Sequence, residues 1–159
     1  MRPQLAIFFL ILATFGATPV VAETWAAYRD DTEKCRLVYP SSVFTISWID
    51  EENFRRFSGP NEDTYFRILG LTNEDQLTPT DIKAEYIKKK GTKDLVYERT
   101  NMDFLVLSGF HGQNIFYTKI ALSSDNDTIC VLHFSYPRKA KRAFDSIVTR
   151  MSRSFAATN

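Results

Sequence analysis

The sequence predicts an α+β domain in which an antiparallel β-sheet is flanked by helices. Four short strand-like runs follow one another between residues 94 and 136, and the short turns between them favour antiparallel neighbours. A helix that begins at a proline is predicted before these runs, over residues 79–90. An amphipathic helix is predicted after them, over residues 138–153, so two helices are available to cover the sheet.

The composition is that of a globular protein. The chain has 159 residues, of which 44% are hydrophobic and 25% are charged, with only six Gly and six Pro. This apolar content excludes the collagen-like and the mostly disordered classes. Twenty Lys and Arg residues face nineteen Asp and Glu residues. Such a balance argues against a nucleic-acid-binding protein, which usually carries a strong basic excess.

Residues 1–22 have the pattern of a cleaved signal peptide. Arg2 precedes an apolar stretch over residues 5–15, which has the length of a signal-peptide core but is short for a membrane span. Val20 and Ala22 fit the positions three and one before a cleavage site, so we expect cleavage after Ala22. An uncleaved N-terminal anchor is the alternative. The sequence therefore predicts export, either to the periplasm or out of the cell.

Residues 23–159 are expected to form a single globular domain without a transmembrane segment. Their number suits one hydrophobic core, and no apolar run of about 18 residues occurs among them. Removal of the signal peptide takes away Arg2 and no acid, so the remaining chain is formally neutral.

The first half of this domain is expected to contain three strands. Residues 23–34 mix aromatic and charged side chains, and we interpret them as a lead-in segment. A strand is predicted over 35–39, because Pro40 cannot donate to a ladder. Residues 44–48 alternate apolar and polar side chains as a half-buried strand does, and residues 65–71 are rich in strand-forming side chains.

The first helix has both a start and a stop signal. Thr78 can cap it, Pro79 fits an early position, and Asp81 lies near the positive end of the helix dipole. Gly91 ends it. The lysines at 88–90 suit the negative end of the dipole, so we interpret them as solvated capping residues rather than as a binding patch.

The second half is predicted to be a meander of four strands and a closing helix. The strands are expected at 94–98, 103–108, 114–122 and 128–136. The apolar residues of the closing helix fall within about 100° of arc. They are Ala140, Phe144, Ile147, Val148, Met151 and Phe155. The other positions hold six basic residues and a single acid, Asp145.

The only two cysteines are predicted to form a disulfide. Cys35 and Cys130 each lie in a strand-like run, on the face that also carries apolar side chains, and export would place both in an oxidising compartment. The bond would bring the first and last strands together. In the chain-entropy model it could contribute about 4–5 kcal/mol. Two buried free thiols are the alternative.

The sequence contains no recognisable catalytic or cofactor motif, such as a Walker loop, GxSxG or HExxH. His133 alternates with Leu132 and Phe134, so it should face away from the core and lie on the surface, as should His111 in a turn. Residues 125–127 lack the Gly and Glu of a calcium loop, and we interpret them as a polar hairpin turn. We therefore expect no catalytic, cofactor-binding or metal-ligating residue, and no enzyme.

Two basic features are candidates for a partner surface. The outer face of the closing helix could dock an acidic protein or an anionic component of the cell envelope. Its residues are Arg138, Lys139, Arg142, Arg150 and Arg153. Arg55 and Arg56 lie between two phenylalanines, a composition found at interaction hot spots. The alternatives are an ordinary solvated helix face and a packed edge strand.

The order of the elements resembles that of the PsbP-like families. The resemblance is carried by Tyr39-Pro40 with Phe44 soon after, by the proline-initiated helix and meander, and by a last helix that ends in Met151-Ser152-Arg153-Ser154-Phe155. Three segments are also similar to small exported proteins of alphaproteobacteria. They are Arg55-Arg56-Phe57, Tyr117-Thr118-Lys119 and Phe134-Ser135-Tyr136-Pro137.

The resemblance implies layers of helix, sheet and helix, and a non-enzymatic accessory or binding role. It carries no catalytic residues and no cofactor. Two other functions stay open: a small-ligand carrier that uses a gap between the sheet and the helices, and a small periplasmic hydrolase of unrecognised type.

Overall fold

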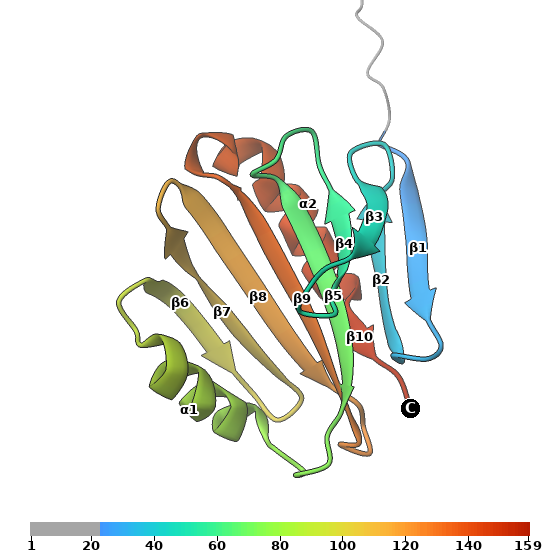
Figure 1. The fold of residues 1–159 in the computed structure, drawn as a ribbon, viewed down its shortest axis with the longest axis vertical. Helices are drawn as coiled ribbons and strands as arrows, with labels where there is room; N and C mark the ends of the chain where they lie inside the picture. The colour runs from blue at the N-terminus through green and yellow to red at the C-terminus, as the bar shows by residue number, and fades with distance from the viewer. Residues whose placement is uncertain (1–22) are drawn as a thin grey trace, which may run out of the picture.

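The computed structural model describes residues 23–159, so the signal peptide predicted over residues 1–22 lies outside the described residues. Ten strands and two α-helices follow one another along this part of the chain (Figure 1). Their bounds are β1 Trp25–Asp30, β2 Cys35–Pro40, β3 Thr45–Ile49, β4 Arg55–Ser58, β5 Tyr65–Thr72, α1 Pro79–Lys90, β6 Leu95–Thr100, β7 Phe104–His111, β8 Asn114–Leu122, β9 Thr128–Pro137, α2 Lys141–Ser154 and β10 Ala156–Ala157. A short 3-10 turn, Arg138–Ala140, leads into α2.

A seven-stranded antiparallel sheet forms the centre of the molecule, in the order β3-β4-β5-β9-β8-β7-β6. The predicted meander is confirmed, because β6 to β9 are neighbours in chain order and every pair is antiparallel. β5 pairs with β9 over its full length, from Tyr65 opposite Ser135 to Thr72 opposite Thr128. The first half of the chain therefore joins the meander at its last strand.

A second, three-stranded sheet has the order β1-β2-β10. Residues 23–34, interpreted as a lead-in segment, instead contain β1, which pairs antiparallel with β2 from Trp25 opposite Pro40 to Asp30 opposite Cys35. Half-buried Ala26 and Tyr28 alternate with exposed residues, as a surface strand requires. The alternation was not recognised in the sequence, because β1 contains two alanines and two charged residues and few strongly apolar ones.

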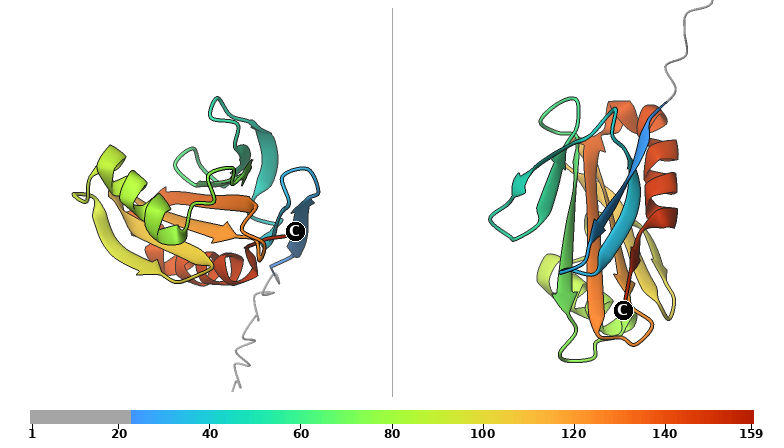
Figure 2. Two further views of the ribbon diagram at one scale, coloured as in Figure 1. Left: turned by 90° about the horizontal axis from the view of Figure 1, so that it is seen from below. Right: turned by 90° about the vertical axis from the view of Figure 1, so that its right-hand side faces the viewer.

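The two helices lie on opposite faces of the large sheet, in the predicted helix–sheet–helix layering (Figure 2). α1 begins with the predicted cap, in which the Thr78 side chain accepts from the Asp81 backbone and the Asp81 carboxylate accepts from the Thr78 backbone. α2 covers the other face. Its buried residues are Phe144, Ile147, Val148 and Met151, followed by Phe155.

The main core lies between α2, the small sheet and one face of the large sheet, and aromatic rings dominate it. Phe66 is fully buried at its centre, stacked 4.2 Å from the Phe57 ring centroid and 5.9 Å from that of Phe134. Phe44 meets Phe66 edge-on at 5.0 Å. Offset and edge-on ring pairs of this kind add to the free energy gained from burial alone.

The predicted disulfide between Cys35 and Cys130 is present, with a Cα–Cα distance of 5.8 Å. It joins β2 to β9, which belong to different sheets, so it ties the small sheet to the large one. The turn after β1 crosses closely over β5 beside this bond. A Cβ atom on Gly70 would lie 2.2 Å from the Glu33 carbonyl oxygen, which explains why that position has no side chain.

One prediction and one alternative about the first strands were wrong. The strand expected over residues 44–48 is not half-buried along its length, because Ile46 and Trp48 are 48% and 59% exposed and only Phe44, just before β3, is in the core. Residues 54–57 were considered as an edge strand, yet β4 lies between β3 and β5. The edge strand on this side of the large sheet is β3.

None of the helices formed by residues 23–159 is long and apolar enough to cross a membrane.

Candidate functional site

The basic residues predicted on the last helix are all exposed on the outer side of α2 and of the 3-10 turn before it. They are Arg138, Lys139, Arg142, Arg150 and Arg153, and Lys141 lies among them. We call these six residues the basic face. Lys141 is paired with Asp145 at 2.6 Å, and none of the other five is in an ion pair within residues 23–159.

Two members of the basic face are held against aromatic rings. The guanidinium carbon of Arg138 lies 3.8 Å from the centroid of Phe110, and that of Arg150 lies 3.9 Å from the centroid of Trp25. Cation–π contacts of this kind fix the position of a charge and leave its hydrogen-bond donors free. The remaining basic side chains project from the helix without such a contact.

The chain separates its charges in space. Residues 138–153 carry six basic side chains and one acidic one, a formal charge of +5, whereas residues 23–137 carry thirteen basic and eighteen acidic ones, a formal charge of −5. The net charge near zero is thus the sum of a strongly basic segment, residues 138–153, and an acidic remainder, residues 23–137. We noted the basic helix in the sequence but did not compare its charge with that of residues 23–137.

The structure does not bring Arg55 and Arg56 to the basic face. They lie in β4, where alternation places Arg55 on the same side as buried Phe57 and Arg56 on the opposite side. Arg56 stacks on the Tyr65 ring at 3.8 Å and lies 5.9 Å from the Trp48 ring. The predicted partner surface is therefore two separate surfaces.

The face of the large sheet opposite α2 is concave, and α1 and the β3–β4 hairpin rise from it on either side (Figure 2). Two adjoining hollows of about 490 and 720 Å³ occupy this face and share Tyr86, Ile120 and Val131 in their walls. We call the two hollows together the groove. Arg67 lies in its wall, 4.3 Å above the Phe54 ring, with Nη1 donating to Asp50 at 3.1 Å and to Glu52 at 2.6 Å.

His133 belongs to the floor of this groove, so the prediction that it lies on the surface was wrong, although it does face away from the main core. Its Nδ1 lies 2.9 Å from the Thr118 hydroxyl. Burial and, less strongly, the positive charge of Arg67 lower the pKa of His133 to about 4, so the ring is neutral at pH 7. His111 is exposed, as expected.

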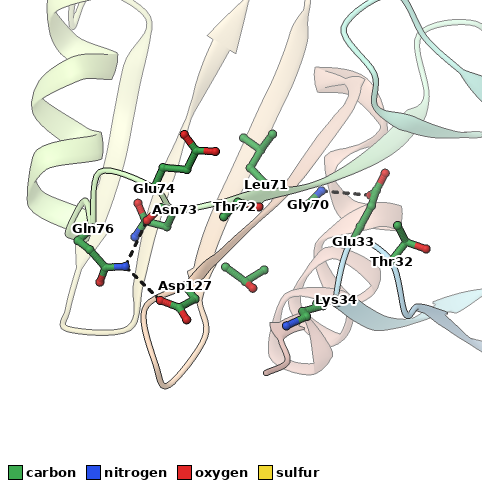
Figure 3. A pocket seen from close by; sticks show the side chains of 11 residues that line it. Thr32, Glu33, Lys34, Gly70, Leu71, Thr72, Asn73, Glu74, Gln76 and Asp127 are labelled. Carbon is green, nitrogen blue, oxygen red and sulfur yellow. Dashed lines mark hydrogen bonds between the residues drawn. The ribbon is translucent and has the colours of Figure 1, made fainter.

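A third hollow, of about 590 Å³, lies where the turn after β1 meets the end of β5 (Figure 3). Two of its three acids are engaged internally, because the Glu33 carboxylate accepts from the Gly70 N–H at 3.1 Å and Asp127 accepts from Gln76 at 3.1 Å. Asp127 belongs to the turn that we predicted to be a plain polar hairpin. Its neighbour Asp125 accepts from Ser123 and from the Asp127 backbone. No group of three or more potential metal ligands occurs among residues 23–159.

From the sequence we left open a gap between the sheet and the helices but did not identify the residues of the groove, although one signal pointed to them. In β9, Ile129 and Val131 alternate with Cys130 and Leu132, so the strand is apolar on both faces. A strand of this kind needs a cover on each side of the sheet. We predicted a helix on each face of the sheet but did not use this pattern to locate a groove.

No protein-family model and no curated protein matches this sequence. Among solved structures, the chain is similar to PsbP (CyanoP) of the cyanobacterium Synechocystis sp. PCC 6803. The TM-score is 0.63 at 12% identity, over 90% of this chain and 98% of that one. It is also similar to the Ran-binding protein Mog1p of Saccharomyces cerevisiae, with a TM-score of 0.55 at 9% identity over 84% of this chain and 95% of that one. A Mog1 point mutant gives 0.53 at 8% identity, over 83% and 95%. At these identities the likeness concerns the fold, and the predicted PsbP-like fold is confirmed.

Proposed function

We propose that this protein is an exported, non-catalytic binding module that docks an acidic surface of a partner protein through the basic face of α2. The observation that carries the proposal is the separation of charge, +5 on residues 138–153 against −5 on residues 23–137. A field of one sign over one face steers and orients a partner of the opposite sign. Mog1p, which shares the fold, is a Ran-binding protein, and this supports a role in protein binding.

Export is the second part of the proposal. The signal-peptide pattern over residues 1–22 and the Cys35–Cys130 disulfide both support it, because structural disulfides persist in oxidising compartments. The resemblance to small exported alphaproteobacterial proteins points the same way.

We expect the exported protein to begin at Glu23. Cleavage after Ala22 leaves the side chains of Val20 and Ala22 in the positions that signal peptidase recognises. N-terminal sequencing and intact mass of the protein from separated cell fractions measure this directly. An N-terminus at Met1 in the membrane fraction would instead support the uncleaved anchor.

Reversing Lys139, Arg142 and Arg153 to Glu is expected to abolish capture of the partner while the thermal midpoint changes little. All three are exposed and without ion pairs, whereas Arg138 and Arg150 contact aromatic rings and are left in place. The measurement is affinity capture from the cell envelope with mass spectrometry, repeated at rising salt. Exposed charges are screened beyond about 10 Å at 0.1 M, so capture should weaken as salt rises.

The matched control reverses three exposed basic residues outside the basic face, Lys34, Arg36 and Lys93, with the same change of charge. This variant should capture the partner as the wild type does. Equal capture by both variants would show that the basic face is only solvated. Binding of the wild type to anionic lipid vesicles without any captured protein would assign the face to the envelope instead. Turnover of a substrate by the purified protein would overturn the non-catalytic role.

A further inference from the structure

The groove has an aliphatic end that α1 does not close. Its 720 Å³ hollow is lined mainly by Leu71, Leu77, Ile82, Ile129 and Val131. Ile82 and Tyr86 of α1 pack against a second buried cluster of the sheet, which includes Ile129. This packing does not fill the whole space, because Leu71 is 48% exposed and in α1 only Pro79 is buried. Exposed apolar surface of this kind, gathered in a hollow, is typical of a binding site rather than of a bare sheet face.

The rim of the same end carries more basic than acidic side chains. Lys88, Lys89 and Glu85 line the aliphatic hollow, and Lys90 and Asp94 line the adjoining one, so three lysines face two acids. None of the three is in an ion pair within residues 23–159, although Lys83 of the same helix is paired with Glu98. The end of a helix dipole carries only about half a unit charge, so three lysines exceed what capping needs. We interpreted them as capping residues, but their place on the rim also allows them to contact a ligand in the groove.

The other end of the groove is polar and uncharged at its floor. Thr118 and neutral His133 lie there, bonded to each other, with Ser135 beside them. Arg67 in the wall is ion-paired with Asp50 and Glu52 through Nη1, although its buried Nε has no hydrogen-bond partner within residues 23–159. The unpaired positive charge of the groove therefore lies on the lysines. The two hollows have the size of small-molecule sites, which usually measure about 300–1,000 Å³.

We propose that the groove binds a single alkyl chain that ends in an anionic group. The chain lies on the aliphatic floor between α1 and β9, and the anion lies at the rim beside Lys88, Lys89 and Lys90. The proposal is independent of the partner surface, because the groove and the basic face are on opposite sides of the large sheet (Figure 2). The carboxylate of a fatty acid and the phosphate of an alkyl phosphate would meet the same lysines.

The test is isothermal titration calorimetry of the purified protein with dodecanoate and with dodecyl phosphate, below the concentrations at which they form micelles. We expect one saturable site per chain for at least one of them, and whichever binds more tightly identifies the anionic group. Hexanoate should bind at least tenfold more weakly than dodecanoate, since each buried methylene adds up to about fourfold in affinity. Dodecyltrimethylammonium should also bind at least tenfold more weakly, because its charge opposes the lysines.

Two variants locate the site. Val131→Trp fills the space shared by the two hollows and should lower the affinity at least tenfold, whereas Val96→Trp, at a 67% exposed position outside the groove, should not change it. Ile82→Trp fills the groove from the α1 side and replaces Val131→Trp if that variant fails to fold. The triple variant Lys88→Ala, Lys89→Ala, Lys90→Ala should lose several-fold in affinity for the anions and gain affinity for the cation, because the opposing charges are removed.

The variant with Lys139, Arg142 and Arg153 reversed should still bind dodecanoate, so a failure of the partner surface is distinguishable from a failure of the groove. The proposal is overturned by the absence of a saturable site, by equal affinity for the cationic amphiphile, or by full affinity in a folded groove-filling variant. Binding to anionic vesicles without binding of the monomeric amphiphiles would overturn it as well.

Discussion

Replacing both Cys35 and Cys130 with alanine is expected to lower the free energy of unfolding by about 2–5 kcal/mol. The two cysteines are 95 residues apart, so the bond removes much of the conformational freedom of the unfolded chain. In the folded state it is also the covalent tie between the small sheet and the large one. The disulfide therefore stabilises both the docking of β1 and β2 and the whole fold.

The measurement is urea denaturation of the wild type and of the double variant, each with and without reductant. The wild type should lose stability in reductant, and the double variant should not respond to it. A single Cys35→Ala change provides a check, because it breaks the same bond and should cost about as much as the double change. A wild-type denaturation midpoint that reductant leaves unchanged would contradict the prediction.

The parts of the fold that the sequence predicted are those whose signals are local. The helix at Pro79–Lys90 begins with a cap that four consecutive residues specify, and the meander has turns whose residues favour antiparallel pairing. The closing helix was predicted because its apolar and basic positions separate at helical period. The pairing of Cys35 with Cys130 followed from their being the only two cysteines, each on an apolar strand face.

The parts that were missed depend on contacts between distant segments. β1 has weak strand-forming residues and exists because β2 supplies its partner, which no local pattern announces. His133 was placed on the surface because it alternates with Leu132 and Phe134, which shows only that it faces away from the main core. Its burial requires α1 and the β3–β4 hairpin to rise from the same face, and this depends on the β5–β9 pairing across more than 50 residues.

The candidate surfaces show the same limit. The basic face is a property of one helix, so its members could be read from the sequence. The position of Arg56 relative to that helix could not be read from the sequence. β4 belongs to the large sheet through its pairing with β3 and β5, whereas α2 packs against one face of that sheet. The charge of the rest of the chain matters equally, since a +5 helix attracts a partner most selectively when the body it lies on is −5.

Truncating Phe66 to alanine is expected to cost about 3–5 kcal/mol of unfolding free energy. Its ring is fully buried and touches the aromatic rings of both sheets, with centroids of Phe57, Phe44 and Tyr39 at 4.2, 5.0 and 5.8 Å. The cavity left behind cannot collapse easily, because the surrounding rings are held by strands on three sides. Since native domains of this kind are stable by about 5–15 kcal/mol, this one side chain decides a large share of the total.

Chemical denaturation, followed by near- and far-ultraviolet circular dichroism, measures the loss of unfolding free energy directly. Phe66→Leu should cost clearly less than Phe66→Ala, because leucine keeps most of the apolar contact, and this order separates packing from any general sensitivity of β5. Tyr97→Ala is the control at an aromatic position that is 51% exposed, and it should change stability by no more than about 0.5 kcal/mol. A Phe66→Ala variant as stable as the Tyr97→Ala control would mean that the aromatic cluster is not the centre of the core. In that case the disulfide and α2 would have to hold the two sheets together without it.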